Sequence, residues 1–175
     1  FLTSEDSKGT DLPKEIVGDT ENNTGVLTDK EPPMNFHSLC MGKIGGMLNK
    51  TFVKLSKTAY ESSDRYIGIS LNVSKTYLSG NNISFWFSFH PYQQDFLKEY
   101  KIGYAAFGCG NDDTLIIFPR DVFLEYKDRM TTTVKGNKMY WHVWIYKTKG
   151  HFELGQAKKE GLTRVNIDRY LNSIT

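Results

Sequence analysis

Residues 83–90 have the sequence Ile83-Ser84-Phe85-Trp86-Phe87-Ser88-Phe89-His90. Apolar and polar side chains alternate here, which is the pattern of a β-strand with one buried face. Phe85, Phe87 and Phe89 share one face, whereas Trp86 lies on the other face among serines. Residues 67–74 alternate in the same way, and turn-forming residues separate the two stretches. We therefore expect residues 67–74 and 83–90 to form a β-hairpin.

Other periodic segments surround this hairpin. Helical spacing of apolar residues predicts helices over 36–48, over 93–100, from Asp121 to Met130 and from about Asn166. Apolar runs predict strands over 104–109, 114–118, 139–146 and 151–154. The pattern favours an α+β fold with one mixed, mainly antiparallel sheet of five or six strands, packed by three or four helices.

Charge divides the chain of 175 residues into two parts. Residues 1–33 contain eight acids and three bases, a net charge of −5, and have no hydrophobic period. We predict that they form an acidic disordered linker or tether. The remaining residues contain 19 bases and 12 acids, a net charge of +7. Residues 34–175 are expected to fold as a single α+β domain.

The cysteine content and the hydropathy indicate the type of protein. Cys40 and Cys109 are too few for a disulfide framework and fit no metal-binding spacing, so we expect two buried thiols in a cytoplasmic protein. No apolar run reaches the roughly 18 residues that a membrane helix requires. The chain starts at Phe1 instead of a methionine, and we expect it to be a piece of a longer polypeptide.

Motifs of well-known enzymes are missing from the sequence. It has no Gly-x-Ser-x-Gly nucleophile turn, and the Gly108-Cys109-Gly110 triplet falls far short of a phosphate-binding loop. These observations favour binding over catalysis, with no cofactor.

Basic and aromatic residues provide the candidate nucleic-acid contacts. Phosphate binding requires Lys and Arg, and single-stranded or extruded bases stack on exposed aromatic rings. Tyr140, His142, Trp144 and Tyr146 share one face of a predicted strand, so that either this face or the opposite one is left outside the core. We select Lys54, Lys57, Lys75, Arg120 and Arg129 as phosphate contacts and Trp86 and Trp144 as stacking residues.

A nuclease is the first alternative. Asp64 precedes the strand 67–74, Lys75 follows it, and a second strand comes next. This arrangement resembles the core of the restriction-endonuclease-like nuclease superfamily, in which an Asp precedes a strand carrying an acid-x-Lys triplet. The resemblance implies Mg²⁺-dependent cleavage by Asp64 and Lys75, with Glu61 or Asp113 as a further acid. The position two before Lys75 is Val73, however, which cannot bind a metal ion.

The broken triplet implies a version of that fold that does not cleave. We therefore predict a non-catalytic DNA-binding domain of a larger prokaryotic DNA-processing or restriction-type defence protein. A protein-interaction module remains the second alternative, because exposed aromatic residues are also typical of protein interfaces.

Overall fold

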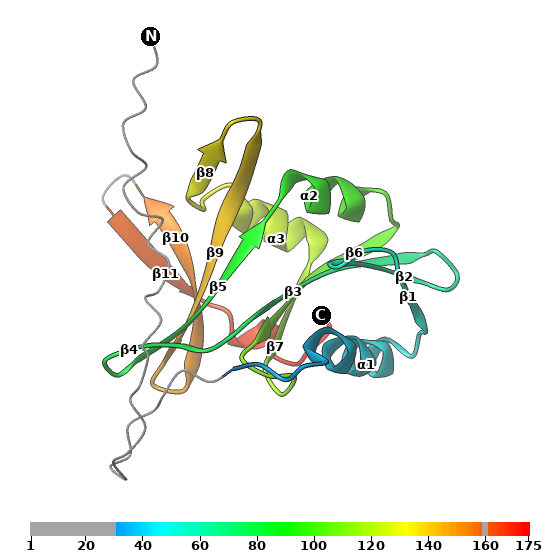
Figure 1. Cartoon of the computed structure of the whole chain (residues 1–175), viewed down its shortest axis with the longest axis horizontal. Coiled ribbons are helices and arrows are strands. Elements are labelled where there is room, and N and C mark those ends of the chain that lie inside the picture. Colours follow the sequence, from blue (N-terminus) through cyan, green and yellow to red (C-terminus); the bar gives the residue numbers. More distant parts are fainter. Residues whose placement is uncertain (1–30, 159–160) are drawn as a thin grey trace.

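The computed structural model describes residues 31–158 and 161–175. Its helices are α1 (Phe36–Leu48), α2 (Pro91–Lys98), α3 (Arg120–Lys127) and the 3₁₀ helix η1 (Asp168–Tyr170). Its strands are β1 (Phe52–Lys54), β2 (Ala59–Ser62), β3 (Ile67–Ser74), β4 (Tyr77–Ser79), β5 (Asn82–Phe89), β6 (Ile102–Cys109), β7 (Leu115–Pro119), β8 (Thr132–Lys135), β9 (Lys138–Thr148), β10 (His151–Lys158) and β11 (Gly161–Asn166) (Figure 1). The predicted acidic tether lies almost entirely outside the described residues.

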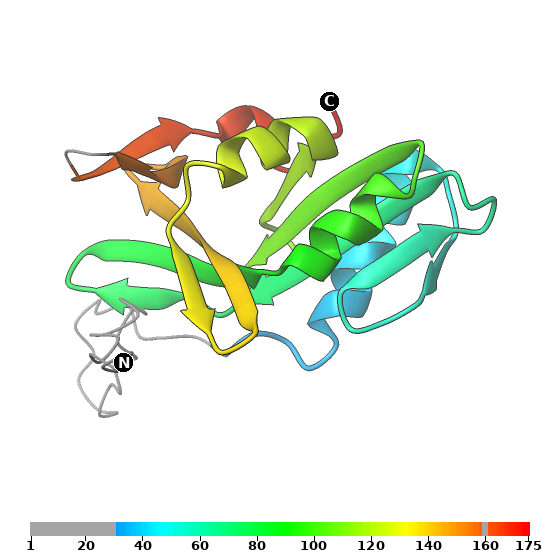
Figure 2. The same ribbon diagram turned by 90° about the horizontal axis from the view of Figure 1, so that it is seen from above.

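The strands form two sheets instead of the single sheet that we expected. The first sheet has the order β1-β2-β3-β6-β7, and its pairing is antiparallel except between β3 and β6. The second has the order β11-β10-β9-β5-β4, with β8 also paired to β9, and is antiparallel throughout. Figure 2 shows the second sheet on the left and the first on the right. The α+β class is thus confirmed.

β3 and β5 connect the two sheets, but they do not form the expected hairpin. β3 pairs along its whole length with β6, whereas β5 pairs with β4 and β9. The short strand β4, which precedes β5 in the sequence, occupies the place beside β5 that the hairpin would give to β3. β3 therefore contacts β5 through its side chains and not through a β-ladder. Asn72 Nδ2 donates to the Ser88 carbonyl at 3.0 Å, and the Trp86 amide donates to Ser74 Oγ at 3.2 Å.

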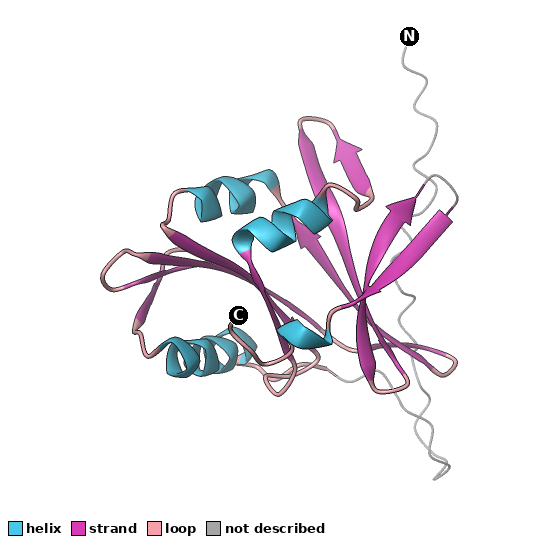
Figure 3. Cartoon of the chain, turned by 180° about the vertical axis from the view of Figure 1, so that it is seen from behind, coloured by secondary structure: helices cyan, strands magenta, loops and turns pink. Residues whose placement is uncertain are grey.

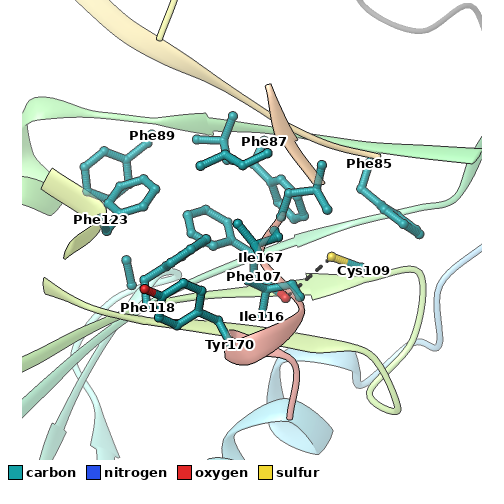
Figure 4. Close-up of a cluster of buried hydrophobic side chains, with 14 of the residues drawn as sticks. Phe85, Phe87, Phe89, Phe107, Cys109, Ile116, Phe118, Phe123, Ile167 and Tyr170 are labelled. Atoms are coloured by element: carbon teal, nitrogen blue, oxygen red, sulfur yellow. Dashed lines mark hydrogen bonds between the residues drawn. The ribbon is translucent and has the colours of Figure 1, made fainter. Parts of the chain in front are cut away.

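The main core lies between the sheets. The phenylalanine face of β5 is buried there, as its alternation predicts, and contacts Phe107 of β6 and Phe123 of α3 (Figure 4). The ring centroids of Phe87 and Phe107 are 5.0 Å apart, and those of Phe89 and Phe123 are 4.7 Å apart, both with edge-to-face geometry. Such pairs add to the hydrophobic stabilisation from burial.

A second core covers the opposite face of the first sheet. Figure 3 shows α1 on one side of that sheet, and α2 and α3 on the other side. Phe36, Cys40 and Ile44 of α1 pack against apolar residues of β3 and β6. Asn35 occupies the N-cap position of α1 but makes no side-chain capping bond. Both cysteines are buried free thiols, as predicted, and burial raises the pKa of Cys40 to about 12.

The end of the chain differs from the prediction. The expected helix from Asn166 is wrong, because residues 161–166 pair with β10 as β11 and only the single turn η1 follows. Ile167, just before this turn, and Tyr170, at its end, are buried. Strands β1, β2 and β8 also escaped prediction, since they are only three or four residues long. No helix among the described residues is long and apolar enough to cross a membrane.

Two buried glutamines allow a matched test of the core. Gln93 and Gln156 are each 2% exposed. Gln93 accepts from the His90 amide and donates to Ser70 Oγ and Asn72 Oδ1, whereas Gln156 Oε1 has no hydrogen-bond partner. An unsatisfied buried acceptor destabilises a fold by about 1–3 kcal/mol.

Gln156→Met should therefore change the free energy of unfolding by about 1 kcal/mol or less, because it removes that acceptor and loses only the one hydrogen bond from Nε2 to the Gly155 carbonyl. Gln93→Met should lower it by about 2 kcal/mol or more, because three hydrogen bonds are lost. Urea denaturation of both variants measures the difference. A loss for Gln156→Met as large as that for Gln93→Met would contradict this assignment.

Candidate nucleic-acid interface

Aromatic side chains cover the face of the second sheet that points away from the core. Because neighbouring residues of a strand point to opposite faces, burying Phe85 and Phe87 places Trp86 outside. Trp144 of β9 is the direct cross-strand partner of Trp86. Both indoles are half-buried. We call this surface, which consists of Trp86, Tyr140, His142, Trp144 and Tyr146, the aromatic face.

One end of the aromatic face carries a positive charge. The Trp144 and Tyr146 rings are nearly parallel, with an interplanar angle of 10° and 6.1 Å between centroids. The Arg164 guanidinium of β11 lies 3.8 Å from the centroid of the Tyr146 ring, which is cation–π geometry. Gly155 of β10 makes room for the rings, since a Cβ there would lie 3.2 Å from Tyr146 and 3.3 Å from Trp144.

Hydrogen bonds hold the Trp86 indole in place. Its Nε1–H donates to His142 Nδ1 at 3.0 Å. His142 must then carry its proton on Nε2, which donates to Thr133 Oγ1 at 2.7 Å. The Tyr140 ring meets Trp86 edge-on, at 6.3 Å between centroids. The indole is therefore held in one orientation with part of its surface exposed.

Lys75 and Lys57 lie near strand β4 or Trp86, whereas the third predicted lysine, Lys54, lies in β1. The Lys75 ammonium lies 5.3 Å from the Tyr77 ring centroid and 3.9 Å from a carboxylate oxygen of Glu31. Lys57 and Trp86 line the same cavity. Lys54 lies close enough to His37 to help lower the pKa of that imidazole, after the larger effect of burial.

The two predicted arginines lie elsewhere. Arg120 Nη1 donates to the carbonyls of Leu97 and Tyr100, at 2.9 and 2.7 Å. It therefore satisfies backbone acceptors at and just beyond the end of α2, as cations near helix C-termini commonly do. Arg129 is exposed in the connection between α3 and β8.

The structure does not bring the predicted nuclease residues together. Asp64 and Lys75 lie beyond opposite ends of β3, whose eight residues span on the order of 25 Å. Hydrogen bonds from Lys50, Ser62 and the Tyr66 amide lower the pKa of Asp64 to about 2, and they hold it in the turn after β2. Within residues 31–158 and 161–175, no three His, Cys, Asp or Glu side chains converge as metal ligands would.

The sequence prediction selected Trp86 and Trp144 as stacking residues but did not select Tyr140, Tyr146 or Arg164 as contacts. Tyr140 and Tyr146 share the face of Trp144 by simple alternation, and that signal was available. Arg164 gave no such signal, because it was assigned to no strand and reaches Tyr146 only through the pairing of β11 with β10.

Comparisons with known proteins give no family for this chain. No protein-family model matches it, and no curated protein or solved structure is significantly similar.

The histidine beneath Trp86 predicts a pH dependence of stability. Burial lowers the pKa of His142 below its ordinary value of 6.5. The unfolded chain therefore binds the proton more readily than the folded chain. The neutral His142 imidazole thus contributes to stability in full above pH 6.5, and this contribution is lost as the pH falls through the folded-state pKa. Protonation would also place a hydrogen on Nδ1, and this nitrogen could then no longer accept the hydrogen bond from Trp86.

His142→Gln should therefore reduce the loss of stability between pH 7.5 and 5, measured by urea denaturation at each pH. Thr133→Val is the control, because it removes a hydrogen-bond partner but keeps the titrating imidazole. An unchanged pH profile for His142→Gln would show that other groups cause the loss.

Proposed function

We propose that this chain is a non-catalytic nucleic-acid-binding domain that binds single-stranded DNA on the aromatic face. The observation that carries this proposal is the Trp86–Trp144 pair, two half-buried indoles on directly paired residues of β5 and β9, on the side without core contacts. Each base stacked on such a ring contributes about 1–3 kcal/mol to binding, whatever its sequence.

Charge supports the same surface. Arg164 lies at the β11 side of the aromatic face, and Lys75 lies near β4 on the other side. A strand crossing the sheet would meet a cation at each side, with the rings between them. Residues 34–175 carry a net charge of +7, which favours a polyanionic ligand.

The shape of the surface favours single strands over duplex. Reading the major groove requires a protruding helix or ribbon, whereas a sheet covered by rings suits unstacked bases. The cellular setting that we propose, a larger prokaryotic DNA-processing or restriction-type defence protein, is supported by the sequence resemblance alone.

Fluorescence anisotropy with labelled single-stranded and duplex oligonucleotides, in EDTA and across a salt series, tests this function. Trp144→Ala should weaken single-strand binding by about tenfold, because one stacking ring is lost. Arg164→Gln should lower the slope of log affinity against log salt by about 0.7, because one phosphate contact is lost. Tyr66→Ala and Lys98→Ala, which replace exposed residues away from the aromatic face, are matched controls and should bind normally.

Absence of binding at low salt would refute the proposal. Binding that is insensitive to salt, and that is as tight in Trp144→Ala as in the unaltered chain, would also refute it. The search would then turn to a protein partner. With Mg²⁺ in place of EDTA, the labelled strand should stay intact, and cleavage that depends on Asp64 would restore the nuclease alternative.

A substitution of Arg120 tests whether this predicted phosphate contact stabilises the fold or binds the nucleic acid. Arg120→Ala should lower the free energy of unfolding by about 1–3 kcal/mol, because two partly buried carbonyls lose a charged donor. The folded variant should bind oligonucleotide as well as the unaltered chain does. Urea denaturation and anisotropy measure the two effects, and weaker binding by a fully folded variant would place Arg120 in the interface.

A further inference from the structure

A cavity lies beside the aromatic face, next to the second half of β3, between the end of β2 and β5. β2 pairs with β3 only as far as Ser70, and the following residues Asn72 and Val73 line the cavity. Its volume is about 360 Å³. Small-molecule sites in proteins usually enclose about 300–1,000 Å³, so the space suits one small ligand.

Flat rings border this cavity. Trp86 contributes its fixed indole, and the His90 and Tyr92 rings also line the space. His90 and Tyr92 are stacked on each other, with centroids 5.2 Å apart and an interplanar angle of 17°. Tyr92 is 60% exposed, so its ring is accessible to a ligand. These rings favour a planar aromatic ligand.

Pre-oriented polar groups lie among the rings. Gln93 Nε2 donates to Asn72 Oδ1 at 2.7 Å, and Asn72 Nδ2 donates to the Ser88 carbonyl at 3.0 Å. The Asn72 amide is therefore held in one orientation. An amide has two N–H donors and two acceptor lone pairs, so it can still offer a hydrogen bond of each kind to the edge of a ligand.

Positive charge surrounds the entrance. Lys57 is exposed and lines the cavity, as does His37 in the first turn of α1. Lys54 and Lys57 both help to lower the pKa of His37, after the larger effect of burial. The first turn of α1 has no acidic residue and no side-chain cap, so its positive dipole end is not neutralised. An anionic group is favoured here.

We propose that this cavity binds a single nucleotide of the bound strand, with its base beside Trp86 and Tyr92 and its phosphate near Lys57. Planar rings suit the base, the fixed Asn72 amide can bond the edge of that base, and the cationic entrance suits the phosphate. Tyr140 connects the two surfaces, because its ring lies 6.3 Å from Trp86 and 5.5 Å from His90. A strand on the aromatic face can therefore turn one base out of its stack into the cavity. This inference rests on the proposed function and adds a separate site to it.

Nucleoside 5′-monophosphates are the probe, with the corresponding nucleosides and ribose 5-phosphate for comparison. Titration of the full chain is followed by NMR through the indole Nε1–H signal of Trp86. At least one monophosphate should shift this signal saturably, its nucleoside should bind more weakly, and ribose 5-phosphate should leave the signal unchanged.

Variants locate the binding. Tyr92→Ala and Lys57→Ala should each weaken monophosphate binding by about tenfold, because one removes a ring and the other a phosphate contact. Tyr66→Ala and Lys98→Ala serve as matched controls and should bind normally. All four replaced side chains are exposed, so the fold should survive each change.

The outcomes separate this site from the proposed function. No shift with any monophosphate, or equal binding by Tyr92→Ala and Lys57→Ala, overturns the nucleotide cavity even if oligonucleotides bind through Trp144. Conversely, monophosphate binding that depends on Tyr92, without any oligonucleotide binding, refutes the single-strand function and leaves a mononucleotide site.

Discussion

Phe85, Phe87 and Phe89 on the inner face of β5 hold the two sheets together, and the candidate sites depend on this contact. These rings pack against Phe107 and Phe123, so the orientation of β5 cannot change without exposing the core. A shift of β5 by one residue would move every phenylalanine to the outside. The same constraint points the other side chains of β5, including Trp86, away from the core.

Two hydrogen-bond systems then turn this outward face into organised surfaces. Thr133, His142 and Trp86 form one chain of bonds, which orients an indole on the aromatic face. Gln93 and Asn72 form the other with the Ser88 carbonyl, where β3 meets β5. Both systems cross between segments that are far apart in the sequence. Such satisfied networks favour a single arrangement of side chains, because any rearrangement leaves partly buried polar groups unpaired.

Part of the candidate site could be predicted from local patterns. Trp86 and Trp144 were selected because alternation places them among polar or aromatic neighbours, and the structure makes them direct partners. Asp64 and Lys75 were grouped through the resemblance to the nuclease superfamily, but they stay at opposite ends of β3, and Asp64 is bound to Lys50 and Ser62. Arg120 was selected for its charge, although its guanidinium is bound to the carbonyls of Leu97 and Tyr100. Charge alone does not reveal whether a side chain has an internal partner.

The sequence by itself determined the three α-helices and most of the longer strands, apart from β11, and it determined which side chains share a face of a strand. These properties follow from periodicity, because side-chain direction along a strand or helix does not depend on the neighbouring element. Only the tertiary structure decided that there are two sheets, that Arg164 covers Tyr146 and that Lys57 shares a cavity with Trp86. Pairing and register between distant strands depend on burial summed over the whole core, which no local stretch of sequence contains.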